Sequence, residues 1–123
     1  MKIQFDKEAT MNSLGFSYTA IHPGEILKEE LAYRGIRQKD FAQTIAVPYT
    51  RLNEILNGKR PITSDFALLV EAALGTPAEH WLNMQARYNL QTSRTKESVV
   101  SRFKSIRSTS PWVKMPQGAI ATT

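Results

Sequence analysis

The sequence predicts an all-α protein whose folded part is a compact domain of five short helices over residues 21–91 of a 123-residue chain. Two observations support this fold class. Apolar residues recur three or four positions apart, as they do on the buried face of a helix with 3.6 residues per turn. Helix signals separate these stretches, such as the Thr63 cap, the Thr76-Pro77 start and the Gly75 stop.

Each helix begins at a recognisable signal. Pro23 fits a first helical turn, and Glu25 favours the positive end of the helix dipole. Thr76 can cap the last helix while Glu79 takes the third helical position, as in a capping box. The five helices are expected to begin near Pro23, Gln38, Tyr49, Ser64 and Pro77, and the last is expected to reach about Leu90.

The segments on either side of this domain differ from it in composition. Residues 1–20 are weakly patterned and are expected to form an N-terminal arm. Residues 92–123 are rich in serine, threonine and basic residues, so we expect a basic, largely disordered and flexible tail. An apolar pattern of i, i+4 and i+7 allows one short helix in this tail, between about residues 96 and 107.

The net charge of +5 comes entirely from the tail. Residues 1–91 hold ten basic and ten acidic residues, whereas residues 92–123 hold six basic residues and one acidic residue. Net charge alone therefore does not indicate that the folded part binds nucleic acid. The chain has no cysteine, no apolar run near the roughly 18 residues of a membrane span, and no signal-peptide core. We therefore expect a cytoplasmic protein that does not contact membranes.

The stretch from Gln38 to Gly58 predicts two short amphipathic helices joined by a turn around residues 46–48. In the second helix, Leu52, Ile55 and Leu56 share one face, and polar residues share the opposite face. These polar residues are Thr50, Asn53, Glu54 and Asn57. A helix with one buried face and one hydrogen-bonding face suits the recognition element of a helix-turn-helix motif. The alternative is an ordinary helical hairpin whose polar face meets only water.

No pattern in the sequence indicates an enzyme, a metal site or a cofactor. The two histidines, His22 and His80, lie 58 residues apart and belong to no cluster with metal-ligand spacing. Glu29 and Glu30 are adjacent and point from different parts of a helix surface, so they do not form a catalytic carboxylate pair. We therefore expect no catalytic residues, no metal and no cofactor.

Five motifs follow one another within residues 21–91. They are His22-Pro23-Gly24-Glu25-Ile26-Leu27, the helix-turn-helix stretch, Asn57-Gly58-Lys59-Arg60, Ile62-Thr63 and Trp81-Leu82-Asn83-Met84-Gln85. In this order and at this spacing they resemble the HigA-type antitoxins, a branch of the phage-repressor-like helix-turn-helix proteins. The two flanking segments lie outside the resemblance.

The resemblance implies a homodimeric antidote protein that binds double-stranded operator DNA, represses its own operon and neutralises a cognate RelE/HigB-like ribonuclease toxin. It assigns base contacts to Tyr49, Thr50, Asn53 and Glu54. It assigns phosphate contacts to Gln38, Arg51, Asn57, Lys59 and Arg60. The carboxylate of Glu54 is at least as well suited to an ion pair with Arg51 or Arg60 as to a base.

Two positions depart from the family pattern. Family members usually carry a small hydroxyl residue as the N-cap of each motif helix, and here these positions are Arg37 and Pro48. Neither side chain can accept the hydrogen bond that a cap requires. Pro48 can still begin a helix through its fixed φ angle. Phosphate contacts from those hydroxyl groups are lost, and Arg37 can substitute as a cation.

The remaining predicted contacts are with protein partners. Candidates for the dimer interface are Trp81, Leu82, Met84 and Tyr88, whose helical spacing also fits an ordinary core. Residues 1–36 hold five acidic and four basic residues, and RelE-like toxins are typically basic. Toxin contacts are therefore expected from this segment, at Ile3, Phe5, Glu29 and Glu30. Two alternatives remain open, a repressor without a toxin and an interaction module that has lost DNA binding.

Overall fold

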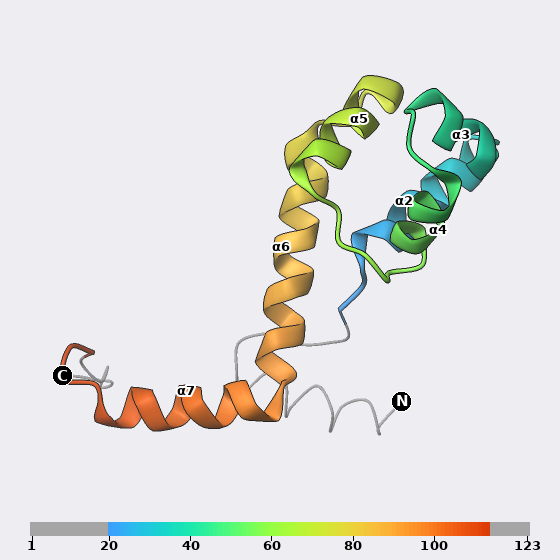
Figure 1. Cartoon of the computed structure of the whole chain (residues 1–123). Coiled ribbons are helices and arrows are strands. Elements are labelled where there is room, and N and C mark those ends of the chain that lie inside the picture. Colours follow the sequence, from blue (N-terminus) through green and yellow to red (C-terminus); the bar gives the residue numbers. More distant parts are fainter. Residues whose placement is uncertain (1–19, 114–123) are drawn as a thin grey trace. The chain divides into compact units, whose positions relative to one another are not determined.

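The computed structural model describes residues 20–113. All the regular secondary structure in that range is α-helical (Figure 1). Its helices are α2 (Pro23–Tyr33), α3 (Gln38–Thr44), α4 (Tyr49–Leu56), α5 (Ser64–Leu74), α6 (Ala78–Thr95) and α7 (Glu97–Thr109). One compact unit is Tyr18–Gln91, and the segment from Thr92 onward belongs to a second unit. The predicted arm, including Ile3 and Phe5, lies almost wholly outside the described residues.

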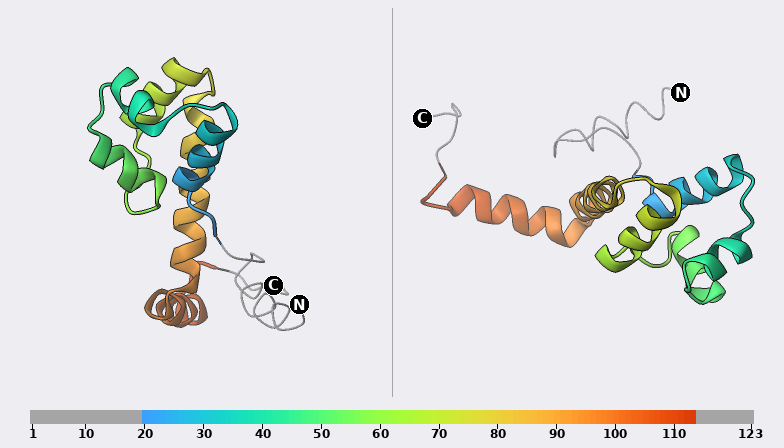
Figure 2. Two further views of the ribbon diagram at one scale, coloured as in Figure 1. Left: turned by 90° about the vertical axis from the view of Figure 1, so that its right-hand side faces the viewer. Right: turned by 90° about the horizontal axis from the view of Figure 1, so that it is seen from above.

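Leucines from α2 and α4 form the centre of the core in the Tyr18–Gln91 unit. Leu27 and Leu31 of α2 and Leu52 and Leu56 of α4 are at most 1% exposed. Both α2 and α3 pack against α4 (Figure 2). Full burial of one leucine side chain stabilises a fold by about 1.5–3 kcal/mol, so these contacts hold α4 firmly against the rest of the unit.

A glycine allows α2 and α4 to approach closely. A Cβ atom placed on Gly24 would lie 1.8 Å from the carbonyl oxygen of Ile55, which is far inside contact distance. The preceding His22 caps α2, because its Nδ1 accepts a hydrogen bond of 2.8 Å from the backbone N–H of Gly24. The first motif of the sequence therefore fixes the distance between α2 and the recognition helix.

Side chains also connect the later helices. Thr63 caps α5 by accepting a hydrogen bond from the backbone N–H of Phe66. The buried Gln85 of α6 accepts a hydrogen bond of 2.8 Å from the backbone N–H of Ile62. This bond anchors the loop between α4 and α5 on α6. Glu71 of α5 accepts a hydrogen bond from the backbone N–H of Ala78 and so satisfies the start of α6.

The turn between α3 and α4 has the expected position. Ala46 adopts a left-handed conformation with φ of 59°, and the N–H of Val47 bonds back to the carbonyl of Ala42. Arg37 and Pro48 make no side-chain cap on the helices that follow them, as the sequence predicts. Gly58 after α4 has the left-handed φ of 76° expected of a residue that follows a helix.

In the described part of the C-terminal segment, which ends at Val113, the helices extend further than the sequence predicts. We expected the fifth helix to end near Leu90, but α6 continues to Thr95, because residues 91–95 contain neither glycine nor proline. Five of the described helices begin between residues 21 and 91, as expected for the domain. The described part of the predicted tail is not largely disordered, because Glu97–Thr109 is a regular helix where the sequence allowed a short one. Its apolar residues lie where the i, i+4, i+7 pattern placed them, with an acidic residue in the first turn and a basic residue in the last.

Candidate nucleic-acid interface

The recognition helix α4 has one buried face and one polar face. Leu52, Ile55 and Leu56 are at most 3% exposed. The four predicted base-contacting residues lie on the same helix, where two are exposed and two are half-buried. The exposed pair is Tyr49 and Thr50, and the half-buried pair is Asn53 and Glu54. The chain therefore carries the division of faces that a recognition helix requires.

The C-terminal end of α4 is held by a side chain from α2 that sequence reasoning missed. The ammonium group of Lys28 donates a hydrogen bond of 3.1 Å to Oδ1 of Asn57. The amide nitrogen of Asn57 in turn donates a hydrogen bond of 2.8 Å to the carbonyl of Asn53. Asn57, predicted to bind phosphate, thus links Lys28 to the end of the recognition helix. No local pattern could reveal a contact between residues 29 positions apart.

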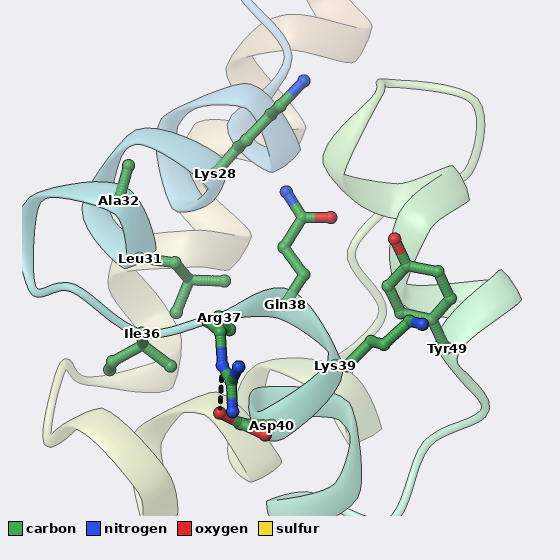
Figure 3. A pocket seen from close by; sticks show the side chains of 9 residues that line it. All are labelled: Lys28, Leu31, Ala32, Ile36, Arg37, Gln38, Lys39, Asp40 and Tyr49. Atoms are coloured by element: carbon green, nitrogen blue, oxygen red, sulfur yellow. Dashed lines mark hydrogen bonds and ion pairs between the residues drawn. The ribbon is translucent and has the colours of Figure 1, made fainter.

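The N-terminal end of α4 borders a hollow on the surface of about 600 Å³. Figure 3 shows the amide of Gln38 between Lys28 and the hydroxyl group of Tyr49. The ammonium group of Lys39 lies 5.7 Å from the centre of the Tyr49 ring, within range of a cation–π interaction. The predicted phosphate contact Gln38 therefore shares this hollow with two lysines that the sequence prediction did not include.

Some basic residues around α4 form ion pairs with carboxylates, and others do not. Arg37 pairs with Asp40 at 2.9 Å, and Arg60 pairs with Glu54. Four others have no carboxylate within ion-pair distance among the residues that the structure describes. These are Lys28, Lys39, Arg51 and Lys59, and each lies on α4, follows it or contacts it. This part of the surface is therefore positive, although residues 1–91 have no net charge.

Glu54 makes one of the two ion pairs that the sequence left open. Its carboxylate bonds to the guanidinium group of Arg60 and not to that of Arg51. The two side chains are 44% and 53% exposed, so water screens the pair and its stabilisation is at most about 1 kcal/mol. Arg60, predicted to bind phosphate, is therefore held by an acidic neighbour.

The candidates for the dimer interface all lie on α6 and differ in how much of each side chain is exposed. Trp81 is 2% exposed and belongs to the core of its own chain, so its side chain has no surface to offer a second copy. Leu82 and Met84 are half-buried against the same core. Tyr88 packs edge-to-face on His22, with ring centres 4.9 Å apart. The helical spacing of these residues cannot distinguish an internal core from an interface.

His22 has a structural position rather than that of a metal ligand. Burial lowers the pKa of His22, because desolvation disfavours the charged imidazolium more than the nearby carboxylate of Glu25 favours it. A neutral ring leaves Nδ1 free to accept the cap bond from Gly24. Residues 20–113 contain no cluster of three or more side chains suited to hold a metal ion. Within the same range no helix is long and apolar enough to cross a membrane.

Comparison with known proteins identifies the family of this chain. A helix-turn-helix family model matches residues 27–81. An addiction module antidote protein of the HigA family from Coxiella burnetii is 36% identical, and its structure superposes with a TM-score of 0.63 over 75% of this chain and 96% of the other. The chain belongs to the HigA family. The resemblance seen in the sequence is thereby confirmed.

Two further relatives of this HigA-family protein are informative. Virulence-associated protein I of Dichelobacter nodosus is 43% identical over 82 residues, which are 65% of this chain and 76% of that protein. The antitoxin HigA of Pseudomonas aeruginosa, solved with the higBA promoter, is 30% identical with a TM-score of 0.63. That comparison covers 76% of this chain and 99% of the other. The family match at residues 27–81 contains all of α2 to α5 except the first four residues of α2, and it does not reach α7.

Proposed function

We propose that this HigA-family protein is a sequence-specific DNA-binding antitoxin that represses its own operon and neutralises a RelE/HigB-like ribonuclease toxin. The observation that carries the DNA-binding part is the polar face of α4 with four unpaired cations around it. A relative solved with promoter DNA supports it. Repression requires that the protein act where the operator is, in the cytoplasm, and no catalytic activity is part of the proposal.

We assign two different roles to the residues that contact DNA. Thr50 and Asn53, with Tyr49 and Glu54, read base edges in the major groove, and an asparagine that pairs with adenine contributes about 1–3 kcal/mol of discrimination. Gln38 and the cations contact phosphates, which fixes position without reading sequence. Lys28 and Lys39 join the predicted phosphate contacts because both border the same hollow as Gln38. Asn57 is held by Lys28 and by the carbonyl of Asn53, and its second amide N–H can still donate to a phosphate.

Operator binding is proposed to need a homodimer, because one recognition helix reads only a few base pairs. Two exposed leucines lie on α5, namely Leu68, which is 58% exposed, and Leu69, which is 38% exposed. Leu69 also lines a hollow with the acidic Asp65. An exposed patch of this kind can pair with a second copy across a two-fold axis. We include this α5 surface in the proposed interface together with Leu82, Met84 and Tyr88 of α6, and we expect the two recognition helices of the dimer to lie about 34 Å apart.

The proposed toxin contact among the described residues is the acidic side of α2. Of the predicted contacts, Glu29 is exposed on α2 and Glu30 pairs with Arg34, so Glu29 is the carboxylate available to a basic toxin. Glu29 lines a hollow together with Lys28 and Asn57, so this face of α2 borders the end of α4. The alternative function, a repressor without a toxin, would be favoured if no small basic RelE-like reading frame adjoins the gene.

The test combines operator binding with rescue from toxin. In band-shift assays, Asn53→Ala should reduce the preference for the promoter of the gene over base-substituted variants, whereas Lys59→Ala should weaken binding to all of them equally. In cells that express the neighbouring reading frame, both variants should still prevent growth arrest. Equal binding of the wild-type protein to promoter and random DNA would contradict the repressor function. Failure of the wild-type protein to prevent arrest would contradict the antitoxin function alone.

A further inference from the structure

The ion pair between Glu54 and Arg60 occupies an unusual place for a DNA-binding surface. Glu54 is the only acidic residue of α4 and lies next to the base-reading Asn53. Its carbonyl group also accepts a hydrogen bond of 2.8 Å from the backbone N–H of Lys59, which holds the following loop close to the helix. The carboxylate and the guanidinium group of Arg60 therefore cancel each other within a surface that is otherwise positive.

Any duplex that approaches α4 brings phosphates towards this pair. If Arg60 turns to a phosphate, the carboxylate of Glu54 is left without a partner and faces the negative backbone of the DNA. If Arg60 stays with Glu54, the protein makes one phosphate contact fewer. Either outcome weakens binding to DNA that offers Glu54 nothing in exchange. A cytosine at the right position changes this balance, because its N4 amino group can donate a hydrogen bond to the carboxylate.

We propose that the Glu54–Arg60 pair is a specificity device that penalises binding to DNA other than the operator. On an operator that presents a cytosine amino group to Glu54, Arg60 is released to a phosphate. On other sequences the pair stays closed. Glu54 then determines specificity through Arg60, in addition to any base contact of its own. This inference rests on the proposed function, since it requires that α4 enter the major groove.

The decisive variant is Glu54→Gln, which keeps the shape of the side chain and removes its charge. We expect its affinity for random DNA to rise about three- to tenfold. The slope of log affinity against log salt on random DNA should also become steeper, by about 0.9 per protomer, because Arg60 gains a phosphate contact. Affinity for the operator should change less, so the ratio of operator to random binding should fall. The double variant Glu54→Gln with Arg60→Gln should return the slope on random DNA to the wild-type value.

A matched control separates this effect from a general loss of negative charge. Glu79→Gln removes one carboxylate from the exposed first turn of α6 and should leave both slopes unchanged. If Glu54→Gln weakens operator binding and leaves the affinity and slope on random DNA unaltered, Glu54 is a simple base contact and the inference is wrong. If Glu54→Gln behaves like Glu79→Gln, the pair has no role at the DNA. If the wild-type protein itself does not prefer the operator, the proposed function fails and this inference fails with it.

Discussion

The number of unpaired cations around α4 predicts how strongly salt weakens operator binding. Lys28, Lys39, Arg51 and Lys59 have no carboxylate partner among the described residues. At about 0.9 per phosphate contact, these four cations and Arg60, which the operator releases from Glu54, give a slope of about −4.5 per protomer and about −9 for a dimer. Affinity for the operator should therefore fall by roughly five orders of magnitude between 50 and 200 mM salt. Fluorescence anisotropy with a labelled operator at five or six salt concentrations measures this slope.

Lys28→Met tests the residue that the sequence prediction missed. The variant should reduce the slope by about 0.9 per protomer, and it should also loosen Asn57, which Lys28 holds. Arg34→Met is the control, because Arg34 already pairs with Glu30 and bonds to the carbonyl of Leu74. Its slope should equal that of the wild-type protein. A Lys28→Met slope equal to the wild-type slope would refute the assignment of Lys28 to the DNA surface.

Three further predictions concern the framework behind this surface. Gly24→Ala should destabilise the fold by about 3 kcal/mol or more and abolish operator binding, because the added methyl group would overlap the carbonyl of Ile55. Thermal melting measures the loss of stability, and an unchanged melting temperature would contradict the prediction. Gln85→Leu should cost about 1–3 kcal/mol in urea unfolding, since it leaves the N–H of Ile62 without its partner. The lowered pKa of His22 means that its contribution to stability is complete above the ordinary value of 6.5 and is lost as pH falls below it. His22→Asn keeps a capping side chain and should remove this component of the pH dependence.

The sequence was sufficient to predict the helices because their signals are local. Thr63 caps α5 and Gly58 follows α4 in the left-handed conformation, as their residue types predict. The turn at residues 46–48 also lies where the apolar pattern is interrupted. The end of α6 was not predicted, since a helix without a glycine or proline stop can continue for as long as its propensity allows. The segment of α7 combines the apolar spacing of a helix with the polar composition of a disordered segment, and composition alone cannot distinguish the two.

The sequence predicts which residues of α4 form the polar face of the candidate site. It does not predict which residues of other helices join them, because those contacts form between segments distant in the sequence. Helical periodicity placed Thr50, Asn53 and Glu54 on one outward face. It could not place Lys28 beside Asn57, since α2 and α4 meet only in the folded chain. Periodicity also could not tell whether Trp81 faces its own core or a second copy. An apolar residue at helical spacing satisfies either arrangement, and only the burial of the indole within one chain decides between them.

The amino-acid composition underestimates the positive charge of the surface around α4. Eight basic residues lie between positions 20 and 91, and three of them are in ion pairs, namely Arg34, Arg37 and Arg60. Four of the other five adjoin α4, so the fold concentrates its available positive charge at one helix while the net charge of residues 1–91 stays at zero. Screening makes charges more than about 8 Å apart nearly independent at physiological salt. A duplex at α4 therefore responds mainly to the charges beside this helix, which are these four cations together with the nearby carboxylates of Glu25 and Glu54.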